Sequence, residues 1–441
     1  MAFVPIYILI LFGTIIIDYL AGILIEKQVS RPQKGHARFF LIVSLVANIG
    51  ILAIFKYYNF FIDNTHILFQ SIGLSNQLPY LDILLPIGLS FHTFQAMSYT
   101  IEVYRGNQKA EKHFGIYALY VMFYPQLVAG PIERPQQILH QFYEKKSFDY
   151  ERVKSGLLLM LVGFFKKLVI ADRLAIIVNP IFNDAQSFPT SSLWLAAVCF
   201  SFQIYCDFSG YSDIAIGSAR VMGFDLMKNF NQPYLSKSVS EFWKRWHMSL
   251  STWFRDYVYI PLGGNRVAVP RWVFNIFLVF VLSGLWHGAN WTFLIWGALH
   301  GFYLIIGYVF KSNTERYFHA IKLSKYGGLL TIWNITVTFF LVTIAWVFFR
   351  ANNLNEAFYF LKHMFLLNFA VKLPGSLMYI LITLTFVVMM ESIHLVQRRV
   401  NLEAWLSHQH LLLRWVVYYT IVFIILYFGA FDKVQFIYFQ F

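Results

Sequence analysis

The sequence predicts an all-α polytopic membrane protein, and three observations carry that prediction. Of the 441 residues, 58% are hydrophobic and only 13% are charged, whereas a soluble domain carries about 25% charged residues. Apolar runs of about 20 residues recur, each long enough to cross a hydrocarbon core of about 30 Å as a helix. Lysine and arginine gather in the short loops between these runs, as expected where they set orientation in a membrane. Because no soluble appendage is evident, residues 1–441 are expected to form a single integral-membrane domain.

The composition also argues against several classes of function. A net charge of +13 can indicate nucleic-acid binding, but the chain has no detached basic domain to carry it. Cys199 and Cys206 fall in one hydrophobic run, so they give neither a disulfide framework nor the spacing of a metal site. Residues 1–25 lack a basic leader and a small-residue cleavage site, so they are expected to be a span rather than a removed signal peptide.

Residues 3–25, 39–62 and 83–103 are the first three expected spans. The loop after the first span is basic, with Lys27, Arg31, Lys34 and Arg38. A basic loop belongs in the cytoplasm, which places the N-terminus outside. The next loop, residues 63–80, has no lysine or arginine and is expected on the outer side.

Polar residues interrupt the next three runs. Residues 117–130 are too short to cross and contain Pro125; they are expected to be a re-entrant or in-plane piece whose freed backbone groups are covered by protein. Residues 156–182 contain charges that must snorkel, pair or line a wet cavity. These charges are Lys166, Lys167, Asp172 and Arg173. Residues 191–217 carry Gln203, Asp207, Ser209, Ser212 and Asp213. We expect that polar helix to face the protein interior.

Residues 228–271 form the longest amphipathic stretch. Basic residues far outnumber acidic ones in it, and Trp243, Trp246 and Trp253 alternate with the charges. A basic, Trp-rich amphipathic segment is typical of a helix in the plane of the membrane interface. We expect it on the cytoplasmic side.

The apolar block 272–310 contains His287, and this residue organises the rest of the interpretation. Gly288 and Asn290 suit a turn, so the block is expected to be two helices that meet at His287. The first arm, residues 272–286, rises only about 22 Å at about 1.5 Å per residue, which is less than the hydrocarbon thickness. An ionisable residue held at that depth is a functional candidate. The alternative is a packing histidine bonded to a neighbouring carbonyl.

Three runs complete the chain: residues 329–349, 377–396 and 411–431. Arg398 and Arg399 place the loop before the last run inside, so both termini are expected outside. Arg350, Lys362 and Lys372 then lie outside, against the positive-inside bias.

The residue chemistry leaves several roles open. A neutral imidazole is the natural proton acceptor near pH 7, and this suits His287 as a general base. For His247 two roles are open: it can orient a substrate, or it can lie at the lipid headgroups. Lys244, Arg245 and Arg255 can hold the phosphates of a donor, or they are ordinary positive-inside charge. Phosphate-loop and Gly-x-Ser-x-Gly patterns are missing from the sequence, which argues against an ATP-driven transporter and a self-contained hydrolase.

Two blocks make the sequence resemble a known family. Residues 242–264, FWKRWHMSLSTWFRDYVYIPLGG, and residues 282–290, LSGLWHGAN, are similar to signatures of the membrane-bound O-acyltransferase (MBOAT) family, in particular its alginate O-acetyltransferase (AlgI-like) type. Further matching pieces are residues 85–91, 124–132, 205–213, 346–351 and 436–441. The chain departs from that type by beginning later and by having His92 where an aromatic residue is expected.

The resemblance implies a fold and a set of site residues. The fold would be a ring of tilted transmembrane helices with re-entrant and in-plane helices around a central tunnel, with a catalytic core at about residues 83–310. His287 would be the catalytic histidine, and His247 would occupy the second active-site position. The candidates to line the tunnel are Trp286, Asn290, Gln203, Asp207 and Trp243.

The resemblance also implies substrates and partners. The donor would be cytosolic acetyl-CoA, without a tightly bound cofactor or metal, and the acceptor an extracytoplasmic polysaccharide such as alginate, peptidoglycan or another exopolysaccharide. The location would be the bacterial inner membrane, and an external SGNH-type acetyltransferase would complete the transfer. DltB-like transfer of D-alanine to teichoic acid is the alternative within the family. A polysaccharide or ion transporter, and a scaffold for polymer secretion, are alternatives of other classes.

Overall fold

The computed structural model describes residues 7–29, 35–74, 78–82, 86, 88–127, 130–321, 326–366, 370–431 and 436–437. Every regular element within these ranges is a helix, which confirms the predicted all-α class. The internal contacts divide the chain into two compact units. Unit 1 is Met1–Asp149 with Met222–Met227, and unit 2 is Tyr150–Val221 with Lys228–Phe441.

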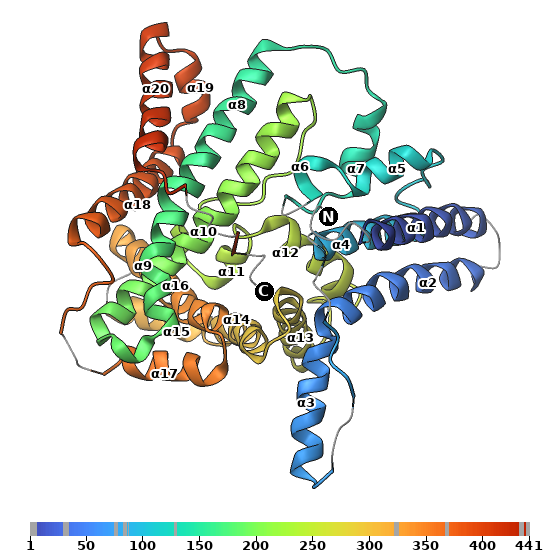
Figure 1. The fold of residues 1–441 in the computed structure, drawn as a ribbon, viewed down its shortest axis with the longest axis horizontal. Coiled ribbons are helices and arrows are strands. Elements are labelled where there is room, and N and C mark those ends of the chain that lie inside the picture. The colour runs from blue at the N-terminus through green and yellow to red at the C-terminus, as the bar shows by residue number, and fades with distance from the viewer. Residues whose placement is uncertain are drawn as a thin grey trace. The chain divides into compact units, whose positions relative to one another are not determined.

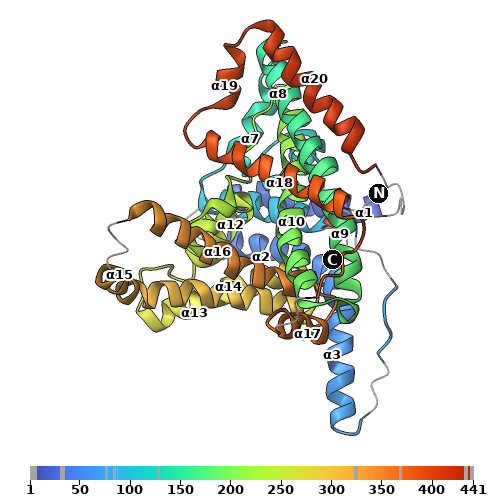
Figure 2. The same cartoon turned by 90° about the vertical axis from the view of Figure 1, so that its left-hand side faces the viewer.

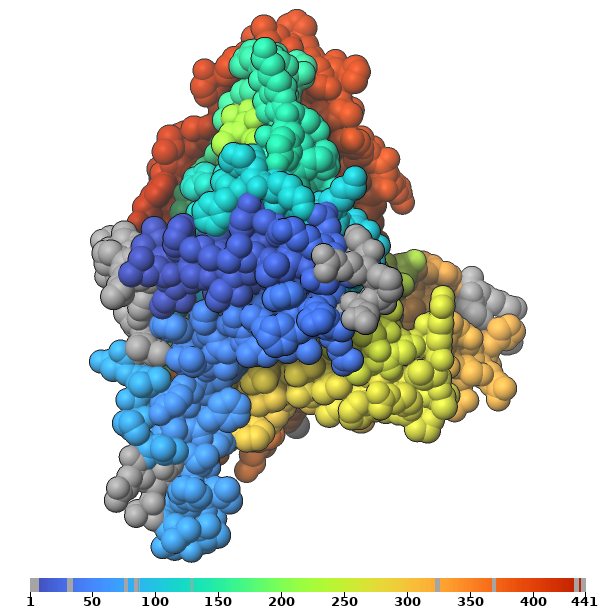
Figure 3. Space-filling model, turned by 90° about the vertical axis from the view of Figure 1, so that its right-hand side faces the viewer, coloured from blue at the N-terminus to red at the C-terminus, as the bar shows by residue number. Residues whose placement is uncertain are grey.

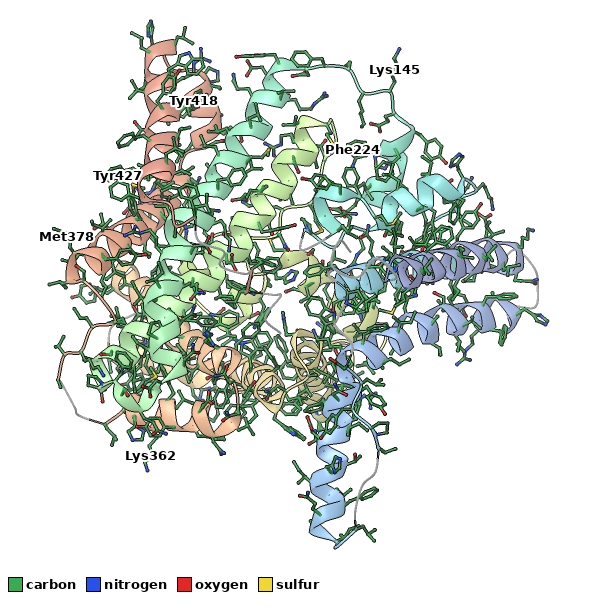
Figure 4. All side chains as sticks on the ribbon, in the orientation of Figure 1. Lys145, Phe224, Lys362, Met378, Tyr418 and Tyr427 are labelled. Atoms are coloured by element: carbon green, nitrogen blue, oxygen red, sulfur yellow. The ribbon has the colours of Figure 1, made fainter. Side chains whose placement is uncertain are left out.

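Eight described helical segments are long and apolar enough to cross a membrane. They are Ile8–Val29, Gly35–Ser71, Thr190–Val221, Val269–His287, Trp291–Val309, Gly327–Arg350, Leu377–Gln397 and Leu411–Phe428. The last of these is mostly exposed to the surroundings, and apolar side chains such as Met378 and Tyr427 project outward (Figure 4). The protein is therefore a multi-pass membrane protein, as the sequence predicted.

Unit 1 is built around three helices that pack against one another: α1 (Tyr7–Val29), α2 (Gly35–Leu52) and α4 (Leu89–Arg105). The first two form adjacent blue bands in Figure 3. A π-helical segment η1 (Ala53–Tyr57) joins α2 to α3 (Tyr58–Ser71). The remaining helices are short: α5 (Phe114–Val121), α6 (Tyr124–Leu127), α7 (Pro135–Ile138) and η2 (Leu139–Tyr143).

The short run at residues 117–130 is broken: among its described residues α5 ends at Val121 and only a single turn follows in α6. Its placement as a re-entrant or in-plane piece stays a prediction. Part of the third expected span, residues 83–85 and 87, lies outside the described residues. Its described part, α4, has 17 residues and is not among the eight apolar segments.

Unit 2 begins with a continuous helical stretch: α8 (Tyr150–Phe164), the π-helical η3 (Phe165–Ala171) and α9 (Asp172–Asn183). The stretch lies alongside α10 (Thr190–Val221), as Figure 1 shows. Glycines permit the approach, since a Cβ on Gly163 would lie 2.6 Å from the carbonyl oxygen of Gly210. Small residues at such crossings let helix backbones meet closely in membranes.

The helices α13 (Val269–His287) and α14 (Trp291–Val309) form the predicted hairpin that turns after His287. They run side by side in Figure 2. A Cβ on Gly284 would lie 2.2 Å from the Phe293 carbonyl oxygen, and one on Gly297 would lie 2.2 Å from that of Phe280. The two glycines therefore set the close packing of the hairpin.

The last helices of unit 2 follow α14. They are α15 (Lys311–Ala320), α16 (Gly327–Arg350), α17 (Leu354–Met364), α18 (Leu377–Gln397), α19 (Leu402–Ser407) and α20 (Leu411–Phe428). The helix α16 packs against α14 and α10. The sequence predicted α16, α18 and α20, and it did not predict the polar helices α15, α17 and α19.

The amphipathic stretch at residues 228–271 is not one continuous helix. It folds as short pieces: η5 (Pro233–Leu235), α11 (Val239–Trp243), α12 (Met248–Phe254) and the π-helical η6 (Arg255–Tyr259). Trp243, Trp246 and Trp253 are all buried, Trp246 to 1% exposure. The three indoles pack on aromatic rings of the protein, so they do not project toward lipid headgroups; the placement of the segment in the interface plane stays a prediction.

Candidate active site

His287 is the last residue of α13 and lies where the hairpin breaks. Gly288 follows in extended conformation, and a Cβ there would overlap the ring of Phe293 at 2.1 Å. Asn290 then starts α14, since its Oδ1 accepts the backbone N–H of Thr292 at 3.0 Å, the usual cap of a helix N-terminus. The glycine and the asparagine thus fix the backbone on one side of His287.

Aromatic rings enclose the His287 imidazole, which is only 4% exposed. Its ring centroid lies 4.9 Å from both Trp286 and Trp296, and 5.3 Å from Phe349. Trp346 stacks on Trp296 at 5.6 Å. We use "the aromatic cluster" for Trp286, His287, Trp296, His300, Trp346 and Phe349. The cluster provides a water-poor surrounding for the histidine.

His247 lies beside the aromatic cluster, with its ring 6.3 Å from Trp286. Its backbone is left-handed, with φ of 42°, so the side chain leaves the chain at a tight bend between α11 and α12. Nδ1 lies 3.2 Å from Oδ1 of Asn229, an oxygen that also accepts from the Ser249 hydroxyl at 3.0 Å. An amide oxygen only accepts, so Nδ1 carries the proton and Nε2 is the basic nitrogen.

Burial lowers the pKa of His247 from its ordinary value of 6.5 to about 3, because the charged form loses its hydration. The imidazole is therefore neutral at physiological pH. The structure places His247 and His287 against the same indole, Trp286, although 40 residues separate them in sequence.

His300 is a site residue that the sequence reasoning missed. It lies on α14, is 0% exposed, and its ring is 5.1 Å from Trp296. The indole N–H of Trp243 donates to its Nδ1 at 3.3 Å. A histidine within an apolar run was a visible signal, but its partner lies 57 positions away in sequence.

Charges on η3, α9 and α10 form ion pairs, which is one of the alternatives that the sequence left open. Lys167 Nζ lies 2.8 Å from Asp172 and 2.6 Å from Asp207, and Lys166 lies 2.6 Å from Asp213. We call these five residues "the charged cluster". Asp207 also accepts the backbone N–H of Ile437 at 2.8 Å, so this candidate tunnel residue ties the described end of the chain to α10.

The remaining candidates have varied surroundings. Gln203 is buried on α10 one turn before Asp207, and the side chain of Asn290, besides capping α14, donates to the Asn352 carbonyl at 2.9 Å. Among the expected phosphate contacts, Lys244 is exposed. Arg245 pairs with Glu241 at 2.6 Å, and Arg255 pairs with Asp256 at 2.7 Å. The role of each in a tunnel or donor site stays a prediction.

The fold and this buried histidine define a class: a multi-pass helical membrane protein with an imidazole in a water-poor aromatic enclosure. Residues 113–351 match the profile of MBOAT, the membrane-bound O-acyltransferase family, and the chain belongs to that family. The matched range includes both His247 and His287.

Curated relatives agree with this assignment. The chain is 41% identical over 361 residues to "Probable alginate O-acetylase AlgI" of Pseudomonas aeruginosa, covering 81% of this chain and 66% of the relative. It is 37% identical to "Peptidoglycan O-acetyltransferase" of Helicobacter pylori, covering 82% and 71%. It is 27% identical to "Teichoic acid D-alanyltransferase" of Bacillus subtilis, covering 74% and 82%. The chain thus spans about two thirds of the length of the AlgI relative.

Proposed function

We propose that the protein is an O-acetyltransferase that uses cytosolic acetyl-CoA for the O-acetylation of an extracytoplasmic polysaccharide. The observation that carries this proposal is His287, a buried imidazole at a helix break, enclosed by aromatic rings within the MBOAT-matched region. The names of the AlgI and peptidoglycan relatives support an acetyl group and a glycan acceptor.

In the proposed reaction the oxygen of the acceptor hydroxyl attacks the carbonyl carbon of the acetyl group. His287 accepts the hydroxyl proton as this carbon–oxygen bond forms. The tetrahedral intermediate collapses with cleavage of the carbon–sulfur bond, and the proton passes from His287 to the departing thiolate. General base catalysis of this kind contributes about 10²–10⁴-fold. The aromatic enclosure limits competing attack by water.

We further propose how the chain is placed. The protein would lie in the bacterial inner membrane with both termini outside, as the basic loops suggest. Lys244, Arg245 and Arg255 would receive the phosphates of acetyl-CoA at the cytoplasmic entrance of a tunnel that leads to His287. An SGNH-type partner outside would pass the acetyl group to the polymer.

The test replaces the proposed base. We expect His287→Ala to insert into the membrane at normal levels and to lower glycan acetylation at least a hundredfold, as read by mass spectrometry of cell-envelope glycans. His319→Ala, at an exposed position on α15, is the matched control and should acetylate normally. Normal acetylation by His287→Ala would disprove the role of His287.

A second candidate is D-alanyl transfer to teichoic acid, which the Bacillus subtilis relative favours. That reaction would take its acyl group from a thioester on a carrier protein. Acetylation supported by free acetyl-CoA and the purified protein would exclude this candidate. D-alanylation that requires an acylated carrier would replace our first proposal.

A further inference from the structure

Three buried N–H groups of the aromatic cluster lack an acceptor among the described residues. Trp296, His300 and Trp346 are each at most 1% exposed. Nε1 of Trp296, Nε1 of Trp346 and Nε2 of His300 find no hydrogen-bond partner among the residues that the structure describes. Each buried donor left in this state costs about 1–3 kcal/mol, so three in one cluster are a substantial burden on the fold.

The hydrogen bond from Trp243 determines which nitrogen of His300 carries the proton. The Trp243 indole can only donate, so the Nδ1 that receives it at 3.3 Å must be unprotonated. In a neutral imidazole the proton is then on Nε2. A second proton on Nδ1 would oppose the indole N–H directly. His300 is thereby held as a hydrogen-bond donor at Nε2, whereas His247 is held as an acceptor at Nε2.

The three rings are in mutual contact, and one of them, Trp296, adjoins His287. Centroid distances are 5.6 Å for Trp296 and Trp346, 5.1 Å for Trp296 and His300, and 6.3 Å for His300 and Trp346. Trp296 also lies 4.9 Å from His287. The cluster therefore gathers donors, with no carboxylate among its members, one ring away from the proposed base.

We infer that Trp296, His300 and Trp346 bind a carbonyl oxygen of the acyl donor. A set made only of N–H donors disfavours cations and suits an atom that accepts without donating. The carbonyl oxygens of the proposed thioester donor are such atoms. The inference rests on the proposed function and adds to it the residues that hold the donor near His287.

Two carbonyls of a coenzyme A thioester fit this chemistry. One is the acetyl carbonyl, whose oxygen becomes negative as the hydroxyl attacks; donors that bind it there lower the barrier, since they strengthen as charge develops. The other is an amide carbonyl of the pantetheine arm, for which the same donors would only tighten binding. The two sources predict different kinetic effects.

The experiment measures donor binding to the full-length protein in lipid nanodiscs. The variants are Trp296→Phe and Trp346→Phe, which remove the N–H and keep an aromatic ring. Trp194→Phe is the matched control, because the Trp194 indole already donates to the Met364 carbonyl at 2.7 Å. The first probe is S-acetonyl-coenzyme A, a ketone that cannot transfer its acyl group, and the second is S-propyl-coenzyme A, which lacks the acyl carbonyl.

Loss of one donor should weaken binding about tenfold, the usual effect of one buried hydrogen bond. If the acetyl carbonyl is the ligand, Trp296→Phe and Trp346→Phe weaken only the ketone, and kcat falls. If an arm amide is the ligand, both probes weaken equally and KM rises with kcat unchanged. Trp194→Phe should bind both probes as the wild type does.

Wild-type affinity of Trp296→Phe and Trp346→Phe for both probes would overturn the inference. To exclude a change of packing, 3-benzothienylalanine at position 296 keeps the bicyclic ring and replaces the N–H by sulfur. The benzothienylalanine variant must lose binding as Trp296→Phe does. If it binds the probes as tightly as the wild type, the inference is overturned. Failure of the proposed function is distinct, because the wild type itself would then neither bind the ketone nor release coenzyme A from acetyl-CoA.

Discussion

The charged cluster and the aromatic cluster both bury polar groups within unit 2, but they treat those groups in opposite ways. In the charged cluster each ammonium meets a carboxylate within 2.8 Å, and Lys167 meets two. In the aromatic cluster the N–H groups of Trp296, His300 and Trp346 meet no acceptor in the described parts of the chain. One region balances its buried charges with ion pairs from the chain itself, and the other leaves three N–H donors without an acceptor among the described residues.

Under our inference, this difference is one between a structural region and a ligand-binding region. Breaking a buried ion pair destabilises the fold strongly, because removing either partner leaves a bare charge. Unsatisfied donors cost the fold free energy, and natural proteins tolerate such departures mainly at functional sites. The contrast also applies to two tunnel candidates on one helix, α10. Asp207 belongs to the charged cluster, since it pairs with Lys167, and Gln203 does not belong to it.

The largest expected effect concerns the charged cluster. Lys167→Met leaves Asp172 and Asp207 facing each other without their cation, and we expect the free energy of unfolding to fall by about 3–5 kcal/mol. Denaturation in mixed micelles measures this loss. Lys237→Met, at an exposed lysine, is the control and should unfold with the wild type.

The same prediction can fail in an informative way. If Lys167→Met is as stable as the wild type, the two carboxylates are protonated or hydrated, and the charged cluster is not a structural clamp. The contrast with the aromatic cluster would then disappear. Adding Asp207→Asn to Lys167→Met should recover part of the stability, because it removes one of the two stranded charges.

A smaller effect tests the neutral imidazole beside the aromatic cluster. Because the pKa of His247 is about 3 in the fold and 6.5 ordinarily, only the unfolded chain takes up this proton as the pH falls below 6.5. Stability due to this residue is therefore lost between pH 6.5 and 3, by about 2 kcal/mol at pH 5. We expect His247→Asn, which tolerates the left-handed backbone, to lose less stability than the wild type between pH 7.5 and 5. Equal losses would show that His247 is accessible to protons in the fold.

Parts of the fold and of the candidate site could be predicted from the sequence, because the signals for them are local. Gly288 and Asn290 mark the hairpin turn because a Cβ at 288 meets Phe293 and the asparagine caps α14. The apolar runs predict the spans because length and hydropathy suffice for that purpose. Charges within a run predict partners, and Lys167 has them.

Other features depend on contacts that no local pattern encodes. Alternating tryptophans and charges have the same pattern whether the indoles face headgroups or protein rings, so the burial of Trp246 required the fold. The donor state of His300 depends on Trp243, which approaches from a distant segment. Asp207 could be expected to pair, but its bond to Ile437 spans 230 positions.

The smallest stability effect is expected at Arg245, whose pair with Glu241 is partly exposed, unlike the charged cluster. An exposed pair contributes about 0.2–1 kcal/mol, so Arg245→Glu should fold nearly as the wild type does. If Arg245 receives phosphates of the donor, this variant should raise the KM for acetyl-CoA several-fold and leave the KM for S-acetyl-pantetheine, which lacks the nucleotide phosphates, unchanged. Glu241→Gln removes the ion pair without reversing the charge of Arg245 and should leave both KM values near the wild type. Equal KM changes for the two donors in Arg245→Glu would mean that the arginine acts through the fold of residues 228–271 and not through the phosphates.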